Sequence, residues 1–97
     1  MDGIIRKNLD DAFANECAYS EVVEAGDWVF LNFCVGNVGQ NVEAQVHGAL
    51  DNMEARLALV GLTLESVVKV DVLMKDPWNI PAMEKVFAER LQLLTIP

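Results

Sequence analysis

Between Asn41 and Gly61, apolar residues recur at spacings of three and four, and polar residues fill most of the positions between them. This period predicts an amphipathic helix with one face turned toward a core. Asn41 is a suitable N-cap, because its side chain can accept a free N–H of the first turn. Gly61 suits the left-handed position that ends many helices. The predicted apolar face consists of Val42, Val46, Ala49, Leu50, Met53, Leu57 and Val60.

After a polar connector at residues 63–66, the period changes from helical to alternating. Every second residue of 67–74 is apolar, which predicts a strand with one fully apolar face. The residues of this face are Val68, Val70, Val72 and Met74. The stretch from 41 to 75 therefore predicts a helix packed on a sheet.

Further elements are predicted on both sides of this stretch. Residues 19–24 and the strongly apolar 28–35 flank Ala25-Gly26-Asp27, and because Gly and Asp favour turns, the pair predicts a β-hairpin. Residues 3–7 are a candidate edge strand. Pro81 suits the start of a second helix, parallel to the first. Its predicted face contains Met83, Val86, Phe87, Arg90, Leu91 and Leu94.

The composition limits the size and the partners of the protein. A chain of 97 residues forms at most one small domain, residues 1–97, and its hydrophobic share of 53% is high enough that some apolar surface is expected to face a partner chain. A net charge of −8, with seven dispersed Lys and Arg residues, disfavours nucleic-acid binding. No apolar run approaches the length of a bilayer span, and the N-terminus lacks a secretory signal.

The two cysteines, Cys17 and Cys34, and the single histidine, His47, do not form a metal-ligand spacing, so no metal site is expected. Nothing in the sequence marks the chain as secreted. Disulfides are rare in the reducing cytoplasm. Both thiols are therefore expected to be reduced and the protein to be cytoplasmic.

Several ordered blocks of residues match a known family between about Ala18 and Leu91. The blocks are residues 18–21, 23–30, 41–45, 49–52, 57–61, 67–73 with Asp76, and 83–89. Together they resemble the RidA/YjgF family of imine and enamine deaminases, whose older names include endoribonuclease L-PSP and translation inhibitor. Each block alone is a weak signal, but the ordered set is fairly specific.

The resemblance implies a chorismate-mutase-like (YjgF-like) α+β fold, in which a mixed β-sheet carries two helices on one face. It implies a homotrimer that binds small imines or 2-oxo acids in clefts between subunits. The family hydrolyses 2-aminoacrylate-type imines to 2-oxo acids and ammonia, and it uses no metal or cofactor.

The resemblance also supplies candidate substrate-binding residues: Tyr19, Asn32, Phe33, Cys34 and Glu84. Tyr19 matches a tyrosine that lines the cleft, although it could equally cover the hairpin. Asn32 stands where a Ser is usual, and it could bind ligand or a neighbouring subunit. Phe33 replaces a Gly that lets ligand approach the backbone. For the next residue, Cys34, a buried and inert thiol is the plainer interpretation.

Glu84 replaces an Asn near the cleft and could act as a general base, although a carboxylate in a first helical turn is also normal. The family's carboxylate-binding Arg, in a Pro-Ala-Arg segment, and a late Glu have no match before Pro97. We therefore expect the last strands to be missing from this chain and the domain to be C-terminally incomplete. Arg56 and Arg90 match neither residue and are expected on outer helices.

Two functions stay open, with no catalytic residue assigned. One is hydrolytic deamination of a small imine or enamine in a subunit-interface cleft. The other is a catalytically silent, trimeric ligand-binding or interaction module that lacks the carboxylate-binding Arg. A ribonuclease is the least favoured reading, because the chain is acidic and has no cluster of His, Lys and Arg.

Overall fold

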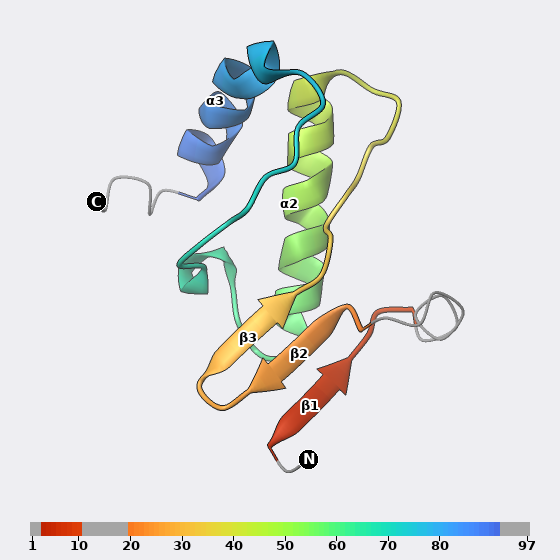
Figure 1. Ribbon diagram of the computed structural model, residues 1–97, viewed down its shortest axis with the longest axis vertical. Coiled ribbons are helices and arrows are strands. Elements are labelled where there is room, and N and C mark those ends of the chain that lie inside the picture. Colours follow the sequence, from red (N-terminus) through yellow and green to blue (C-terminus); the bar gives the residue numbers. More distant parts are fainter. Residues whose placement is uncertain (1–2, 11–19, 92–97) are drawn as a thin grey trace.

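The computed structural model describes residues 3–10 and 20–91, and Figure 1 labels its elements. Three short strands form one end of the molecule, α2 extends from it, and α3 lies toward the opposite end (Figure 1). The elements are β1 (Ile4–Lys7), β2 (Val22–Ala25), β3 (Trp28–Leu31), α2 (Val42–Ala58), the 3-10 turns η1 (Leu64–Ser66) and η2 (Pro77–Asn79), and α3 (Ile80–Arg90). The predicted α+β class is confirmed.

The three strands pair in the order β1-β2-β3, and both pairings are antiparallel. Ala25 pairs with Trp28 across the two-residue turn Gly26-Asp27, so the predicted hairpin and edge strand are confirmed. β3 ends at Leu31, although the sequence predicts a strand to residue 35. The cause is a side chain of α2 that binds the backbone after Leu31, as described below.

Both predicted ends of α2 are confirmed. The Asn41 side chain accepts the Ala44 N–H at 2.8 Å. At the other end, Gly61 has φ +73° and donates its N–H to Ala58 O at 3.2 Å, while the Leu62 N–H reaches Leu57 O at 3.0 Å. This pair of bonds is the Schellman motif, whose left-handed residue is best supplied by Gly.

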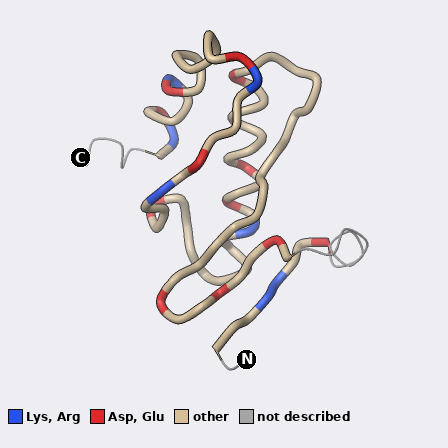
Figure 2. Tube along the Cα trace, viewed as in Figure 1, with Lys and Arg blue, Asp and Glu red and all other residues tan. Residues whose placement is uncertain are grey.

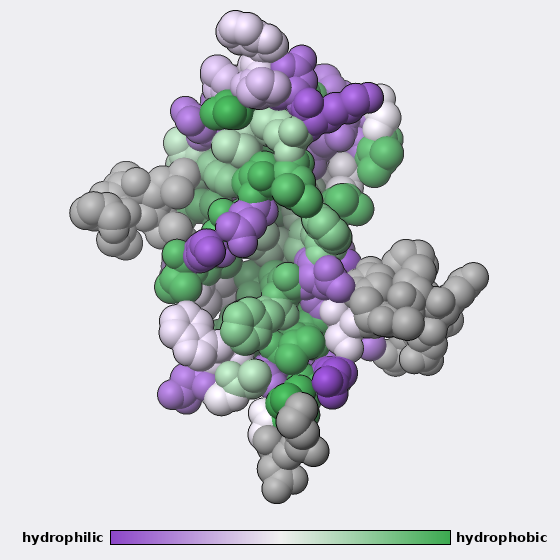
Figure 3. Space-filling model, viewed as in Figure 1, coloured by the Kyte–Doolittle hydropathy of each residue, from purple (hydrophilic) through white to green (hydrophobic). Residues whose placement is uncertain are grey.

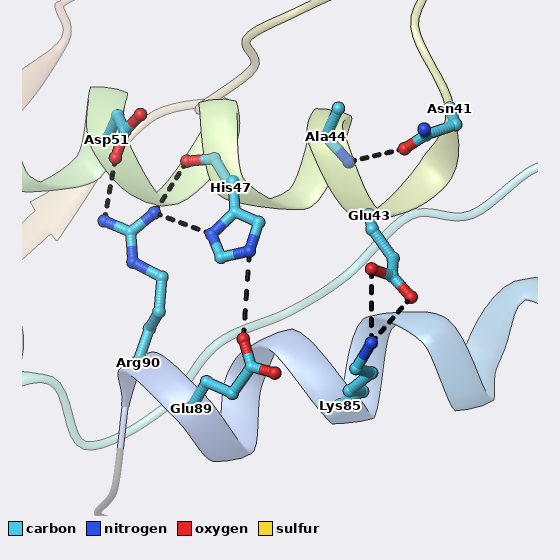
Figure 4. Close-up of polar contacts among 8 residues, drawn as sticks. All are labelled: Asn41, Glu43, Ala44, His47, Asp51, Lys85, Glu89 and Arg90. Atoms are coloured by element: carbon cyan, nitrogen blue, oxygen red, sulfur yellow. Dashed lines mark hydrogen bonds and ion pairs between the residues drawn. The ribbon is translucent and has the colours of Figure 1, made fainter.

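α3 lies beside α2 and runs parallel to it, as predicted. Lys85 Nζ lies 3.3 Å from Glu43 Oε1 in the first turn of α2. Five residues later along α3, Arg90 Nη2 lies 2.8 Å from Asp51 Oδ1 (Figure 4). From the first contact to the second, the residue number increases along both helices, so the two helices run parallel.

The main core lies between the helices and the chain that joins them. Leu50, Val86 and Leu91 are at most 3% exposed and form its centre. Partly buried side chains surround these three: Val46, Met53, Leu64, Val70 and Phe87. The helical faces predicted from the sequence therefore face this core.

The prediction of a strand over residues 67–74 is wrong for the described part of the chain. These residues have no strand assignment and run as an extended, irregular stretch beside the helices (Figure 1). Alternation sets which side chains share a face, but a strand also needs a neighbour to hydrogen-bond with. Within the described residues, the sheet ends at β3, and nothing pairs with this stretch.

Two features of the surface concern partners. Lys and Arg residues are dispersed among acidic ones, without a basic patch along the described chain (Figure 2). Hydrophobic residues cover much of the face seen in Figure 3. Among the exposed ones are Trp28, Phe30, Phe33, Val68, Leu73 and Trp78. No helix in residues 3–10 and 20–91 is long and apolar enough to cross a membrane.

Candidate functional site

A buried ion pair joins α2 to the sheet. Arg56 Nη2 lies 3.2 Å from Glu21 Oε2, and each of the two side chains is only 6% exposed. The other Glu21 oxygen, Oε1, accepts the Asp10 N–H at 2.9 Å. Glu21 also donates its backbone N–H to Asn8 Oδ1 at 2.7 Å. The carboxylate therefore ties the segment after β1, the start of β2 and α2 together.

The same guanidinium binds the backbone just beyond β3. Arg56 Nη1 donates to Asn32 O at 3.0 Å and to Phe33 O at 2.7 Å, and it lies 3.8 Å from Cys34 Sγ. In a regular strand, successive carbonyls point to opposite sides. Here two successive carbonyls turn to one nitrogen, which is why the strand stops at Leu31.

The turned carbonyls fix the direction of two amides. In a planar trans peptide, the N–H of one residue points opposite to the C=O of the residue before it. The N–H groups of Phe33 and Cys34 therefore point away from Arg56. Phe33 N–H donates to Asn32 Oδ1 at 2.8 Å, and Cys34 N–H has no hydrogen-bond partner within the described residues. Adjacent amides that point the same way bind anionic or carbonyl oxygens.

Cys34 is partly buried and free of a disulfide. Burial raises the pKa of its thiol, and the Glu21 carboxylate raises it further, while the nearby Arg56 guanidinium opposes both. The thiol contacts Asn32 O at 3.4 Å. A nucleophilic cysteine needs a lowered pKa or an adjacent base. Cys34 therefore fits the inert thiol that the sequence already favoured.

His47 belongs to a separate cluster on the helix pair. Its Nε2 lies 3.9 Å from Glu89 Oε2, and its Nδ1 lies 3.3 Å from Arg90 Nη1 (Figure 4). Arg90 also donates to His47 O at 2.9 Å. These contacts explain His47 as a surface residue that joins α2 to α3. Within the described residues, no three His, Cys, Asp or Glu side chains lie together as metal ligands.

The predicted site residues are only partly brought together. Asn32, Phe33 and Cys34 form one turn against Arg56, and the Phe33 side chain is 67% exposed. Glu84 is exposed on α3, next to Lys85, which contacts Glu43. Glu43 and Arg56 are separated by 13 positions of α2, a rise of about 20 Å. Glu84 thus lies at the opposite end of α2 from the turn, and Tyr19 lies outside the described residues.

Arg56 was expected only to lie on an outer helix and to match neither family residue, and sequence reasoning missed the burial of both Arg56 and Glu21. A signal was present in the helical period. Arg56 follows Met53 by three positions and precedes Val60 by four, so it shares the face of these two apolar residues. A charge on that face needs a buried partner. Glu21, directly before the buried Val22, is that partner.

A cavity of about 250 Å³ lies apart from this turn, between the extended stretch and α3. Its lining is mostly apolar, with Lys69 as its one charged side chain. Lys69 Nζ lies 3.7 Å from Asp71 Oδ1, and both side chains are largely exposed. None of the candidate residues from the sequence lines this cavity. It is a gap at the edge of the core rather than part of the site.

An α+β chain with this hairpin, two parallel helices and a backbone turn after β3 defines a class of small domains. Residues 9–97 match the family described as endoribonuclease L-PSP, and the chain belongs to that family. A RutC family protein of Pyrococcus horikoshii, PH0854, is 30% identical over 78 residues. That match covers 73% of this chain and 62% of the relative, so the chain spans less than two thirds of this curated relative.

Two solved structures have the same fold. A hypothetical protein from Streptococcus pyogenes M1 GAS, a member of the yjgF family, is 51% identical with a TM-score of 0.85 over 95% of this chain and 72% of that one. Rv2704 from Mycobacterium tuberculosis, of the YjgF/YER057c/UK114 family, is 26% identical with a TM-score of 0.79 over 89% of this chain and 72% of that one. The predicted RidA/YjgF membership and fold are confirmed.

Proposed function

We propose that this protein is a hydrolytic deaminase of small reactive imines or enamines of the 2-aminoacrylate type, which it converts to 2-oxo acids and ammonia. The observation that carries the proposal is the backbone turn at Asn32–Cys34. It directs two amide donors away from the buried Arg56, at the position where the family resemblance expects a ligand to meet the backbone. Membership of the L-PSP family supports the same reaction class.

In the proposed hydrolysis, backbone amides rather than side chains hold the substrate. The amides of Phe33 and Cys34 would hold an oxygen of the substrate, and water would add to the carbon of the C=N bond. Collapse of the resulting carbinolamine breaks the C–N bond, releases ammonia and leaves the C=O of a 2-oxo acid. Hydrogen bonds that hold the substrate in place contribute through orientation rather than through a perturbed nucleophile.

The cleft is completed, in this proposal, by other copies of the chain. Glu84 lies about 20 Å along α2 from the turn, so it would reach the same substrate only from a neighbouring subunit. The exposed Trp28, Phe30 and Phe33 give such an assembly an apolar contact surface. A homotrimer that acts in the cytoplasm fits these residues and the free Cys34.

The direct test is the release of ammonia from freshly generated 2-aminoacrylate. Wild-type protein should accelerate the release above the rate in buffer. Cys34→Pro removes one amide N–H and should abolish the acceleration. Cys34→Ala is the matched control, because it removes the thiol and keeps the amide, and it should retain the activity. A wild-type rate equal to buffer at high protein concentration would end the proposal.

A specific observation supports a second function, a catalytically silent module that binds small 2-oxo acids. The cation nearest to the turn, Arg56, is 5% exposed and is already paired with Glu21, so it does not bind a substrate carboxylate. Such a module would bind pyruvate or 2-oxobutanoate and raise its melting temperature without releasing ammonia. The absence of any shift across a panel of 2-oxo acids would count against it. A ribonuclease is the least supported function, because the net charge is −8.

A further inference from the structure

We propose that Arg56 is a positioning residue that builds the two-amide site at Phe33 and Cys34 from inside the protein. The inference rests on the proposed use of these amides by a ligand oxygen. It assigns to this chain's own buried ion pair the task of fixing their direction. Arg56 touches no ligand in this scheme and acts only through the backbone.

The first step of the argument is that the turn departs from the conformation its sequence favours. Residues 28–35 are rich in aromatic and β-branched residues and predict a continuous strand. The Asn32 N–H still continues the ladder, because it donates to Glu21 O at 3.0 Å. Beyond that bond, both carbonyls turn to Arg56 Nη1. The hydrogen bonds to the Arg56 guanidinium therefore replace those that a continued strand would make.

The second step concerns the choice of an arginine for this place. Replacing a buried ion pair by apolar residues of similar volume is often neutral or stabilising. The Arg56 Nε–H is also buried and has no hydrogen-bond partner among the described residues, which adds a cost. Packing alone would therefore favour an apolar residue here. What only a guanidinium supplies is a rigid fork that binds the carboxylate with one nitrogen and two carbonyls with another.

The third step concerns Asn32, whose amide oxygen accepts the Phe33 N–H at 2.8 Å. That oxygen occupies one of the two donors, as an oxygen of a carboxylate or carbonyl ligand would. Asn32 is exposed. Binding would then exchange the internal oxygen for one of the ligand, at the geometry that Arg56 has already set.

The test uses four variants of the full chain and pyruvate as the probe. Arg56→Lys keeps the charge beside Glu21 but removes the planar fork. The double variant Glu21→Met/Arg56→Met removes the whole pair, so that no lone charge unfolds the protein. Arg90→Met is the matched control, because Arg90 also pairs with a carboxylate but joins α3 to α2, away from the turn. Asn32→Ala frees the Phe33 amide.

Two readouts are needed. Residual dipolar couplings report the directions of the Phe33 and Cys34 N–H bonds in the unliganded protein. Pyruvate titration, followed at the same two amide resonances, gives the dissociation constant. Both Arg56 variants should reorient the two N–H bonds and weaken pyruvate binding by roughly tenfold, about one net hydrogen bond. Arg90→Met should leave both unchanged, and Asn32→Ala should tighten binding.

The outcomes separate this inference from the proposed function. If the Arg56 variants keep the wild-type N–H directions, the inference is wrong, whatever the protein binds. If the directions change but the pyruvate affinity does not, Arg56 is not a positioning residue for binding and the inference again fails. If the wild-type protein neither binds pyruvate nor releases ammonia, the proposed function fails, and the N–H directions alone decide whether Arg56 builds the turn.

Discussion

Arg56 on α2 and Arg90 on α3 both form ion pairs with carboxylates, but the two arginines have different structural roles. Arg56 is buried at the sheet end of α2 and contacts one carboxylate and two backbone carbonyls. Arg90 is 18% exposed on α3 and contacts Asp51 and His47 on α2 (Figure 4). It also pairs with Glu54, likewise on α2. The first arginine shapes a loop, whereas the second joins two helices.

This difference indicates that the burial of an arginine, rather than the number of its partners, determines its structural role. Around Arg90, water screens the charges and can replace a lost partner, because the Asp51 and Glu54 side chains are 68% and 50% exposed. Around Arg56, water does not reach the ion pair, so each group depends on the other.

The largest effect is expected for Arg56→Met. The substitution leaves the Glu21 carboxylate buried, and among the described residues the Asp10 N–H still donates to it. Breaking a buried pair in this way should lower the free energy of unfolding by about 3–5 kcal/mol. Urea denaturation, followed by far-UV circular dichroism, measures the change.

The double variant Glu21→Met/Arg56→Met is the control for that result. It removes both charges, so it should recover most of the stability that Arg56→Met loses. If the double variant were as unstable as Arg56→Met, the loss would come from packing rather than from a stranded charge. A loss below about 1 kcal/mol in the single variant would show that the pair is exposed in solution.

A smaller effect is expected for Arg90→Met. This variant removes an ion pair with Asp51 and a hydrogen bond to His47 O, but the acids that remain are solvated. The expected loss is about 1–2 kcal/mol, the sum of a few screened contacts. The same urea titration, repeated in 1 M NaCl, should show a reduced loss. A loss of stability equal to that of Arg56→Met would show that burial does not distinguish the two arginines.

The elements that the sequence predicts best are those whose signals are local. The Asn41 cap, the Gly61 terminus and the Gly26-Asp27 turn depend only on nearby backbone, and all three are found where expected. The strand over residues 67–74 depends instead on hydrogen bonds to a distant partner. Alternation alone could not establish such a partner, which is why that prediction failed.

The candidate site shows the same division. Asn32, Phe33 and Cys34 were identified from the family resemblance, and they do form one turn. Sequence reasoning assigned Arg56 no structural role beyond its place on an outer helix, although its spacing from Met53 put it on the buried face. The resemblance could not identify its partner, since the Arg56–Glu21 contact joins residues 35 positions apart. Pairing of that kind is decided by the tertiary fold.

The Lys85–Glu43 pair should contribute less than the contacts of Arg56 or those of Arg90. Its nitrogen and oxygen lie 3.3 Å apart, but the side chains are 61% and 47% exposed. Lys85→Met should change the free energy of unfolding by less than about 0.5 kcal/mol. Because the lysine adds nothing buried, the change should vanish in 1 M NaCl. A larger loss would mean that α3 depends on this pair for docking.

The last prediction concerns Cys34 and has no effect at neutral pH, where the thiol is protonated in both the folded and the unfolded chain. Burial raises the pKa of Cys34 in the folded protein, so the unfolded chain loses this proton first as the pH rises. The folded state then binds more protons than the unfolded state, and stability falls with increasing pH. The stability of the wild type relative to Cys34→Ala should therefore decrease from about pH 8.5 upward.

Taking the difference between the two proteins cancels every other group that titrates in this range. Urea midpoints measured at intervals from pH 7 to pH 10 give the comparison. If this difference in stability rose with pH instead, the effect of Arg56 on the pKa of Cys34 would outweigh the effect of burial. Cys34 would then be a thiol that ionises readily rather than an inert one. Arg56 would then lower the pKa of the Cys34 thiol as well as orient the backbone. The proposed mechanism would have to include Cys34 as a nucleophile.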